Sequence, residues 1–426
     1  MKMRSAWILA SLLLLNAAAP TWAQEAPSPN QPVKLADLLA DAERNNPQIQ
    51  AARHGWQSAQ QVPTQVSTLP DPQFVFQHVS VGSPRPFAGY TNSDFAYVGF
   101  GVSQDFPYPG KLRLRGEIAK KDSDVTQQRY ESVRRAILAE VKMSYFQMAY
   151  LAKRQTILEG DGQLLQQVEQ SAEARYRNGM GNQHDVLQAQ LERTKLLREI
   201  TTNQLESGKV QARIKQLLNR PQSSPDIETT EISESLPAYT YDQLLAAAKA
   251  NNPEIAGAQK MVEKQGLQVD LAKKDFYPDF NLQYMWQRTD PAQFRAYYVV
   301  TLGVRIPIYR GRRQQPELTQ AEADQSRAKS EYEMQTQQIA FQLRQQFLAA
   351  EKSAELLKIY REGLVPQARA ELQAGMAAYQ SNRQDFQALL ASFLDVLKLD
   401  EEYWQTLSEH ETALAQIEGV TGLSLR

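Results

Sequence analysis

Four short stretches of the chain alternate between apolar and polar residues. The clearest runs over 280–287 and places four apolar side chains on one face, namely Phe280, Leu282, Tyr284 and Trp286. The stretches 96–105 and 300–306 alternate in the same way, whereas 74–81 alternates poorly. Alternation with a period of two predicts β-strands. We therefore expect four strands, which occur as two pairs.

Each pair of strands ends in a joint with the same order of residue types. The first joint contains Pro107 and Gly110, and the second contains Pro307 and Gly311. Proline cannot continue the pairing of a strand, and glycine permits a sharp change of direction. Each joint is therefore predicted to lead from a strand into a helix. Basic side chains follow both joints, namely Lys111, Arg113, Arg115, Arg310, Arg312 and Arg313.

Long, highly charged segments follow the joints. The segments 111–176 and 312–379 predict helices about 100 Å long. Glycines are expected to interrupt both helices, at Gly160 and Gly162 in the first and at Gly363 in the second. Pro366 is expected to kink the second, because its ring clashes with the preceding turn.

Two turns then reverse the chain. Gly179 and Asn382 suit the left-handed residue of a tight helix reversal, and Asp185 and Asp385 suit the N-cap of the returning helix. The returning helices, at 186–219 and 386–418, and the helices that enter the strands are each expected to be about 50 Å long. Apolar residues in the last helix follow a seven-residue repeat typical of a coiled coil, namely Phe386, Leu390, Phe393, Leu397, Trp404, Leu407 and Leu414.

The two halves of the chain also share a motif. Residues 35–49 and 241–255 have Leu-Leu, Asn-Asn-Pro and Ile in the same register, which indicates an internal duplication. We expect a first repeat over 24–220, a linker over 221–240 near the middle of the helical rod, a second repeat over 241–418 and a tail over 419–426.

The first residues predict export. Lys2 and Arg4 precede an apolar run and Thr21-Trp22-Ala23, so residues 1–23 are expected to be a secretory signal peptide. The chain has no cysteine, which excludes a lipoprotein anchor and a thiolate nucleophile. Its 4 histidines have no metal-ligand spacing, and a net charge of -1 gives no reason to expect a nucleic-acid partner.

The alternating strands fit either a soluble sheet or a membrane barrel. No other stretch has the ~20 apolar residues of a spanning helix, so a membrane crossing would need the strands. The export signal and the aromatic residues near the strand ends favour the membrane; these are Tyr97, Tyr284, Trp286, Tyr297 and Tyr298. Because small membrane barrels have about eight strands, several chains would have to share one barrel.

Behind the signal peptide, the chain has the same order of elements twice: strand pair, long helix, tip turn and returning helix. This order resembles the outer-membrane efflux protein family, the TolC-like exit ducts. The run Arg175-Tyr176…Gly179-Met180…Asp185-Val186-Leu187 is similar to the first tip motif of that family. The run Tyr379…Asn382…Asp385-Phe386…Leu389-Leu390 is similar to the second, with Asn382 where glycine is usual. Two further runs resemble its heavy-metal efflux branch, Leu69-Pro-Asp-Pro-Gln73 and Ser103-Gln104…Pro109-Gly110-Lys111.

The resemblance implies an α+β protein of the outer membrane that acts as a homotrimer. Four strands from each chain would form one shared twelve-stranded barrel, which continues into a periplasmic coiled-coil tunnel. The basic residues after the strands would lie near the inner edge of the membrane, in contact with solvent or lipid headgroups.

The resemblance also implies passive export without a cofactor. A periplasmic adaptor would couple the tips to an inner-membrane pump of RND or ABC type. The residues expected to contact the adaptor are Gly179, Met180, Gly181, Asn382 and Arg383. Those expected at the tip aperture are Asp185, Arg383 and Asp385, although helix capping explains the two aspartates equally well.

Two other functions remain as alternatives. An exported coiled-coil spacer or adaptor that does not transport would explain the helices, but not the four strands or their joints. An enzyme is least favoured, because the sequence contains no nucleophile elbow, phosphate loop or paired His/Asp/Glu site.

Overall fold

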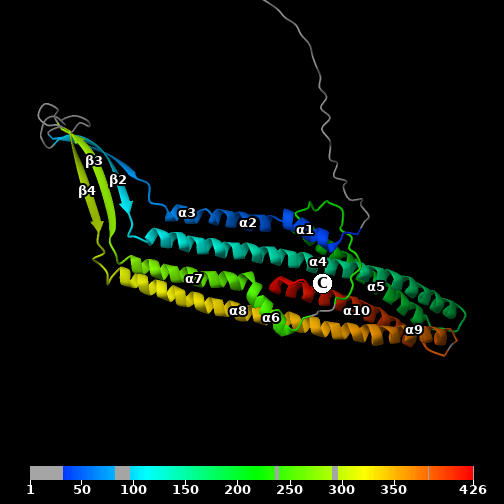
Figure 1. Ribbon diagram of the computed structural model, residues 1–426. Coiled ribbons are helices and arrows are strands. Elements are labelled where there is room, and N and C mark those ends of the chain that lie inside the picture. Colours follow the sequence, from blue (N-terminus) through cyan, green and yellow to red (C-terminus); the bar gives the residue numbers. More distant parts are fainter. Residues whose placement is uncertain (1–31, 82–95, 236–238, 290–295, 382, 426) are drawn as a thin grey trace, which may run out of the picture.

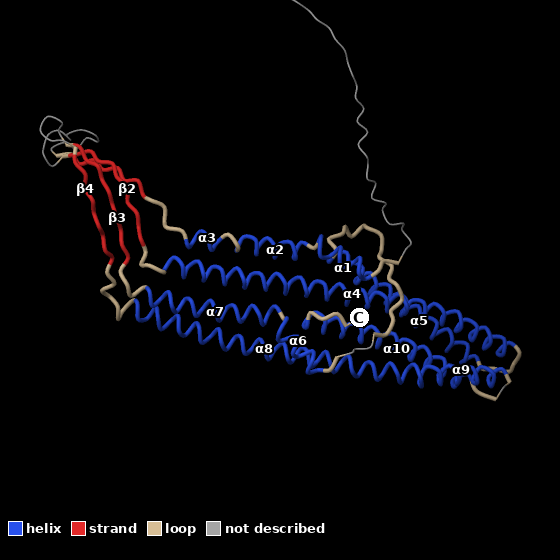
Figure 2. The backbone as a smooth tube through the Cα atoms, in the orientation of Figure 1, coloured by secondary structure: helices blue, strands red, loops and turns tan. Residues whose placement is uncertain are grey.

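A sheet of four strands stands at one end of a long rod of helices (Figures 1 and 2). The computed structural model describes residues 32–81, 96–235, 239–289, 296–381 and 383–425. The expected signal peptide, most of both loops between paired strands, and Asn382 lie outside these residues. None of the described helices combines the length and the hydropathy needed to span a lipid bilayer.

The first half of the chain has three helices, two strands and two longer helices. These are α1 (Leu35–Asn45), α2 (Pro47–Ala59), α3 (Val62–Ser67), β1 (Gln73–Val79), β2 (Tyr97–Phe106), α4 (Lys111–Arg177) and α5 (Gln183–Leu217). The 67 residues of α4 correspond to about 100 Å, as predicted. The expected interruption at Gly160 and Gly162 is wrong, because α4 continues through both positions. Packing evidently outweighs the ~1 kcal/mol helix penalty of each glycine.

The second half follows nearly the same order. Its elements are α6 (Tyr241–Asn251), α7 (Pro253–Lys274), β3 (Asp279–Arg288), β4 (Tyr297–Arg305), α8 (Gln314–Ile359), η1 (Tyr360–Leu364), α9 (Val365–Gln380) and α10 (Phe386–Thr421). The 22 residues of α7 correspond to about 33 Å, and a break separates α2 from α3, so the helices that enter the strands are shorter than expected.

Pro366 changes its helix in a specific way. It lies in the first turn of α9, and the preceding turn, η1, is a π-helix in which Val365 N–H donates to Tyr360 O. A proline leaves the carbonyl four residues earlier without a donor and its ring clashes there. The wider π turn relieves that clash, so the expected kink takes the form of a π-helical turn.

The strands form one antiparallel sheet in the order β1-β2-β3-β4. Phe100 of β2 lies opposite Phe76 of β1 on one side and Trp286 of β3 on the other. Tyr284 of β3 likewise lies opposite Val300 of β4. The sheet therefore joins the two halves of the chain through the pairing of β2 with β3, and it leaves β1 and β4 at its two edges.

The helices form a layer in which α4 contacts helices near the sheet and helices near the far end. Near the sheet, α4 packs against α2, α3 and α7, and α7 packs against α8. Toward the far end, α4 packs against α5 and α10, and α10 packs against α8 and α9. Each long helix is thus matched by two shorter ones placed end to end (Figure 1).

Two asparagines connect those helix ends. Asn46 accepts hydrogen bonds from Gln48 N (2.9 Å) and Ile49 N (3.2 Å) at the start of α2, and its Nδ2 donates to Leu217 O at the end of α5 (2.8 Å). Asn252 caps α7 in the same way and donates to Val420 O in the last turn of α10 (3.0 Å). The Asn-Asn-Pro motif thus begins one helix and fixes it to the end of another.

Candidate functional site

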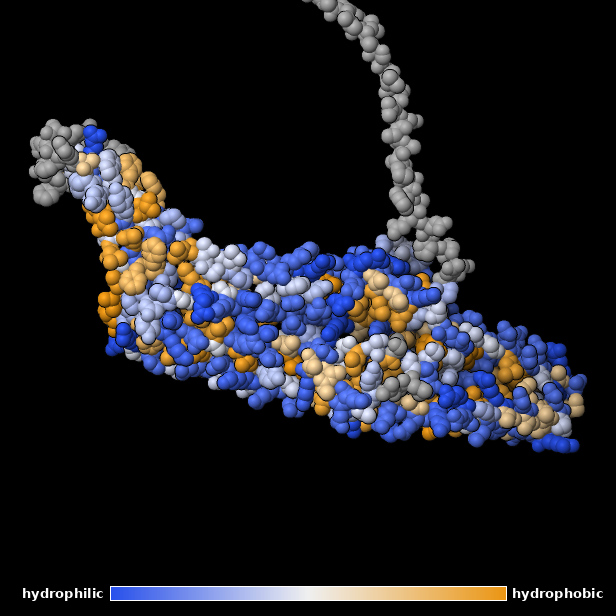
Figure 3. Space-filling model, in the orientation of Figure 1, coloured by the Kyte–Doolittle hydropathy of each residue, from blue (hydrophilic) through white to orange (hydrophobic). Residues whose placement is uncertain are grey.

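The two faces of the sheet differ in character. On one face, neighbouring strands place large apolar side chains side by side; these are Phe74, Phe76, Phe100, Val102, Tyr284, Trp286, Tyr298, Val300 and Leu302. All of them are exposed in the single chain. The apolar surface covers the strands, whereas the visible face of the rod is mainly hydrophilic (Figure 3).

The other face carries mainly small and polar residues, although Val75, Met285 and Val299 also lie on it. Gln73, Ser103, Gln283 and Thr301 form one row across the four strands. Nearer the joints, the amide of Asn281 donates to Ser103 Oγ (3.0 Å) and to Asp105 Oδ1 (2.9 Å). Exposed apolar residues on one face of a sheet and polar residues on the other are typical of the strands of a membrane barrel.

The first joint is held by a buried lysine. Lys111 is 3% exposed, and its Nζ lies 3.0 Å from Asp275 Oδ1 and 2.9 Å from Asp279 Oδ1. The backbone N–H of Tyr108 donates to the same oxygen of Asp279 (2.8 Å). Gly110 precedes α4 with a φ of 93°, a value that favours glycine. The expectation of an exposed Lys111 at the membrane edge is therefore wrong, because its charge is paired inside the joint.

The second joint is built differently. Pro307 follows the end of β4, and the backbone N–H groups of Arg312 and Arg313 both donate to Tyr309 O (3.0 and 2.9 Å). The positive-φ residues of the described chain do not include Gly311, so the turn does not need a glycine there. The side chains of this joint are exposed, in contrast to those of the first.

At the far end of the rod, α4 ends in a Schellman turn. Met180 N–H donates to Arg175 O (2.9 Å), and Gly179 N–H donates to Tyr176 O (3.0 Å). Gly179 has a φ of 67°, as its predicted left-handed role requires. In the second turn Arg383 N–H donates to Ala378 O (2.8 Å), the matching bond at the end of α9.

The two tip turns meet around one arginine. Arg175 Nη1 donates to Tyr379 O (2.7 Å), and its guanidinium lies 4.5 Å from the centre of the Tyr379 ring. That ring packs edge-on against Phe386 at 6.0 Å. Burial raises the pKa of the Tyr379 hydroxyl above its ordinary value.

A depression of about 520 Å³ lies between the tip turns. Its lining includes most of the residues predicted for adaptor contact or the aperture, namely Met180, Gly181, Asp185, Arg383 and Asp385. Sequence reasoning did not find Arg175 and Tyr379 as the contact between the turns, because they lie 204 positions apart.

The two tip aspartates have different local roles. Asp385 caps α10 as predicted, since its Oδ1 accepts from Ala388 N (2.9 Å). Asp185 does not cap α5, because that helix begins earlier, at Gln183, with Asn182 as its N-cap. Asp185 instead lies in the first helical turn, where a negative charge is favoured by the helix dipole.

Acidic residues gather where α4 meets α10 in the tip half of the rod. Burial, together with the nearby charges of Asp400 and Glu401, raises the pKa of Asp161 to about 6. Arg369 opposes this shift and pairs with Asp400 (2.8 Å). Arg154 joins Glu401 (3.2 Å) and Glu199 (3.1 Å) beside them.

The segment between the two halves is fixed to the rod by a buried pair on α10. His410 Nε2 donates to Ser235 O (2.8 Å), and Glu411 accepts from the Ser235 N–H (2.8 Å) and hydroxyl (3.2 Å). Arg361 of η1 forms an ion pair with Glu234 of the same segment. Glu411 lies in α10 between Leu407 and Leu414 of the apolar repeat, and it binds the segment between the two halves.

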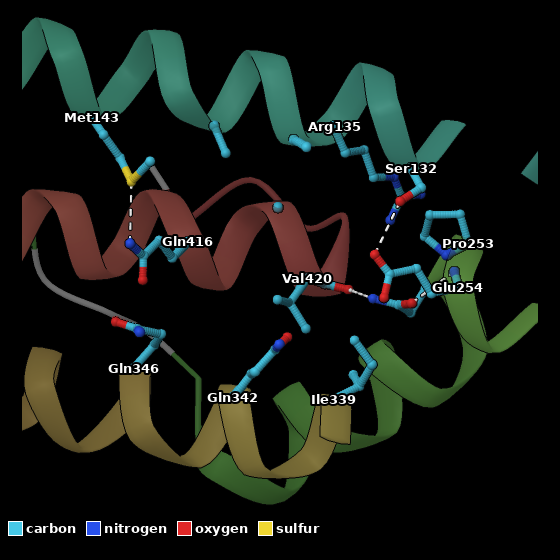
Figure 4. Close-up of a pocket in the computed structure, with 14 residues that line it drawn as sticks. Ser132, Arg135, Met143, Pro253, Glu254, Ile339, Gln342, Gln346, Gln416 and Val420 are labelled. Carbon is cyan, nitrogen blue, oxygen red and sulfur yellow. Dashed lines mark hydrogen bonds between the residues drawn. The ribbon is translucent and has the colours of Figure 1, made fainter. Parts of the chain in front are cut away.

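A cavity of about 410 Å³ lies where α10 ends and α7 begins (Figure 4). Glutamine side chains from α8 and α10 line it, and Ser132 Oγ donates to Glu254 Oε1 across one end (3.0 Å). Within the described ranges, no group of three or more histidines and carboxylates is placed to hold a metal ion.

Comparison with known proteins assigns this architecture. The family model described as "Outer membrane efflux protein" matches residues 38–220 and 244–416. The multidrug resistance outer membrane protein MdtQ of Escherichia coli O6:H1 is 24% identical over 375 residues, which cover 81% of this chain and 78% of the relative.

Solved structures agree with the fold. The outer-membrane channel OprN superposes with a TM-score of 0.80 at 18% identity, over 92% of this chain and 90% of that chain. The outer membrane protein VceC from Vibrio cholerae superposes with a TM-score of 0.77 at 18% identity, over 92% and 97%. The chain shares the fold of these proteins.

Proposed function

Because the chain belongs to the outer membrane efflux protein family, we propose that it is the exit duct of a tripartite efflux system. In this proposal three copies form a channel through the outer membrane and a tunnel through the periplasm. The duct is a passive conduit, performs no chemistry on its cargo and needs no cofactor. Energy is supplied by an inner-membrane pump of RND or ABC type, through a periplasmic adaptor.

The observation that carries the proposal is the one-sided apolar sheet. Burying large apolar side chains normally stabilises a fold, at about 25 cal/mol per Å², yet here a whole row of them faces outward. Lipid is a solvent in which such a face is stable. Open strand edges are not stable in lipid, so β1 of one copy must pair with β4 of the next. A shared twelve-stranded barrel satisfies both requirements.

The helical layer supports the same ring. One edge of the layer is formed by α2 and α3 near the sheet and by α5 toward the tip, the other edge is formed by α8 and α9, and both α5 and α8 carry exposed apolar residues. These are Leu187, Leu191, Leu197 and Leu205 on α5, and Met334, Phe341, Leu348 and Leu356 on α8. Two different edges that meet head to tail close a ring. The matching arrangement of elements in the two halves supports an origin by internal duplication.

The tip is the site proposed for the adaptor and for the aperture. The adaptor contacts Gly179, Met180, Gly181, Asn382 and Arg383. The charges of Asp185, Arg383 and Asp385, which line one depression, bias passage through the aperture. The similarity to a multidrug resistance protein favours organic drugs as cargo, and heavy-metal ions are the second candidate.

The test of the duct is mass and conductance. The detergent-purified protein should have the mass of three chains and should form channels in planar lipid bilayers. A single chain without conductance would overturn the duct and favour an exported coiled-coil spacer. Efflux of a panel of drugs and metal ions, measured in cells that lack their own duct, would then identify the cargo.

The tip assignment has its own test. Gly179→Trp should abolish efflux and leave the trimer intact, because no atom outside the turn lies within 4 Å of the added side chain's first carbon. Gly179→Ala, which has the same backbone strain at a φ of 67° but not the bulk of tryptophan, is the matched control and should retain efflux. Full efflux by Gly179→Trp would show that the adaptor docks elsewhere.

A further inference from the structure

The segment 306–313, which follows β4, combines exposed apolar and basic residues. Ile306, Ile308 and Tyr309 are 60%, 73% and 68% exposed. Arg310, Arg312 and Arg313 follow within one turn and are also exposed. We call this segment the second-joint loop.

The two joints differ in how their aromatic and basic side chains are paired. At the first joint, Tyr108 stacks on Tyr277 with ring centres 4.6 Å apart, and Lys111 is paired with two aspartates. In the second-joint loop, Arg313 pairs only with Glu317 (3.3 Å). Among the residues that the structure describes, no carboxylate lies within ion-pair distance of Arg310 or Arg312. This loop therefore carries free positive charge beside an exposed apolar surface.

The loop also continues the outward face of the sheet. Val300, Leu302 and Val304 alternate along β4 on that face, and Ile306 and Ile308 follow at the same spacing of two. All five side chains are exposed. The apolar column thus runs past the last residue of the strand and ends at a tyrosine and three arginines. Aromatic and basic residues in that order are typical of the boundary between hydrocarbon and headgroups.

We propose that the second-joint loop binds anionic phospholipid headgroups of the leaflet that faces the periplasm. Ile308 and Tyr309 enter the leaflet, and the three arginines contact phosphate groups. This inference rests on the proposed barrel, because the barrel places the loop at that leaflet. It goes further in selecting anionic lipid and in assigning it to one of the two joints.

Native mass spectrometry of the detergent-purified oligomer tests the lipid preference. The probes are phosphatidylglycerol, which is anionic, and phosphatidylethanolamine, which has no net charge. A basic residue at an anionic surface contributes about fivefold to affinity, so three should contribute roughly 100-fold. The triple variant Arg310→Gln, Arg312→Gln, Arg313→Gln should therefore lose most of the preference for phosphatidylglycerol.

Matched variants distinguish lipid binding at this loop from an effect of the overall charge of the protein. A triple variant at exposed arginines of α5 and α8, Arg193→Gln, Arg198→Gln, Arg327→Gln, has the same change in charge and should keep the preference. Lysines at the three loop positions should keep most of it. If the triple loop variant is not produced in a measurable amount, the single variant Arg312→Glu is measured instead, with a partial loss expected.

Two results would overturn the inference. One is an unchanged lipid preference in the loop variant. The other is a fall to single chains in detergent, which would identify the loop as a contact between copies. Conductance of the same samples is recorded in parallel. A loop variant that conducts normally but has lost its lipid preference supports both proposals, whereas an unmodified protein that does not conduct overturns only the duct.

Discussion

Replacing Asn46 by aspartate would separate the two roles of its side chain. The Oδ1 atom caps α2, and the Nδ2 atom donates to Leu217 O at the end of α5. Aspartate is as good an N-cap as asparagine, but it has no amide donor. If capping were the whole role, Asn46→Asp would be almost neutral.

The structure leads us to expect a loss instead. Without the amide, the carbonyl of Leu217 has lost its partner in a buried site, which costs about 1–3 kcal/mol. The ionised carboxylate would also lie against that carbonyl oxygen. Asn46→Ala loses the cap as well, about 1 kcal/mol more, for a total of about 2–4 kcal/mol.

Hydrogen–deuterium exchange measures these costs locally. A loss of 1–3 kcal/mol should speed exchange in the first turn of α2 and the last turn of α5 by roughly 5- to 150-fold. Asn45→Asp is the matched control, because Asn45 is exposed and lies one position earlier; we expect a cost of less than about 0.5 kcal/mol there. Wild-type exchange in Asn46→Asp would refute the bridging role.

The second half gives an internal comparison. Asn252 donates to Val420 O in the same way, and both residues line the 410 Å³ cavity at the helix junction (Figure 4). Water in that cavity can replace a lost partner. Asn252→Asp should therefore cost less than Asn46→Asp, about 1 kcal/mol or less. An equal or larger cost would show that the cavity does not admit water to Val420.

Three further substitutions test other parts of the argument. Lys111→Met leaves two carboxylates unpaired at the first joint; because these side chains are 39% and 31% exposed, the cost should be about 1–3 kcal/mol, seen as a lower melting temperature of the purified oligomer. The pKa of Asp161 is higher in the folded protein than in the unfolded chain, so the carboxyl group ionises first in the unfolded chain and the free energy of unfolding falls as pH rises from about 4 to 6. Asp161→Asn should therefore raise the melting temperature at pH 8 and leave it unchanged at pH 4. Leu302→Arg on the outward face of β4 should make the free energy of membrane insertion less favourable by about 2–4 kcal/mol, whereas Thr301→Arg on the opposite face should have little effect. The amount of heat-stable oligomer in membranes, compared between the two variants, checks both.

The strands and their faces could be predicted because alternation is a local signal. The face that carries Leu282, Tyr284 and Trp286 agrees with the sequence pattern. The strand β1 was expected as well although it alternates poorly, and its pairing with β2 confirms it. At the joints, where glycine was expected to permit a sharp turn, Gly110 has a left-handed backbone, whereas Gly311 does not. The pattern Pro-then-Gly therefore predicted a change of element and not a shared backbone conformation.

What the sequence could not provide were partners that are distant along the chain. Lys111 looked like an exposed base because Asp279 lies 168 positions away, in the other half. Asn46 caps the neighbouring helix α2, but its second partner lies 171 positions away. The same holds for Arg175 at the tip. Composition and periodicity describe a residue's own element, whereas these side chains obtain their roles from another.

The two halves of the chain differ in structure, which matters for the contacts within the proposed ring of several chains. Two halves with identical edges would form a ring of equivalent contacts, in which any half could follow any other. In this chain one joint is internally paired and the other is exposed, and only the second long helix contains the π turn of η1. The segment between the halves is held differently by each of them, through the hydrogen bond of Tyr145 with Thr230 in the first half and through α10 and η1 in the second. The two halves are therefore not interchangeable, so in the proposed ring the contacts between the halves of one chain should differ from the contacts between chains.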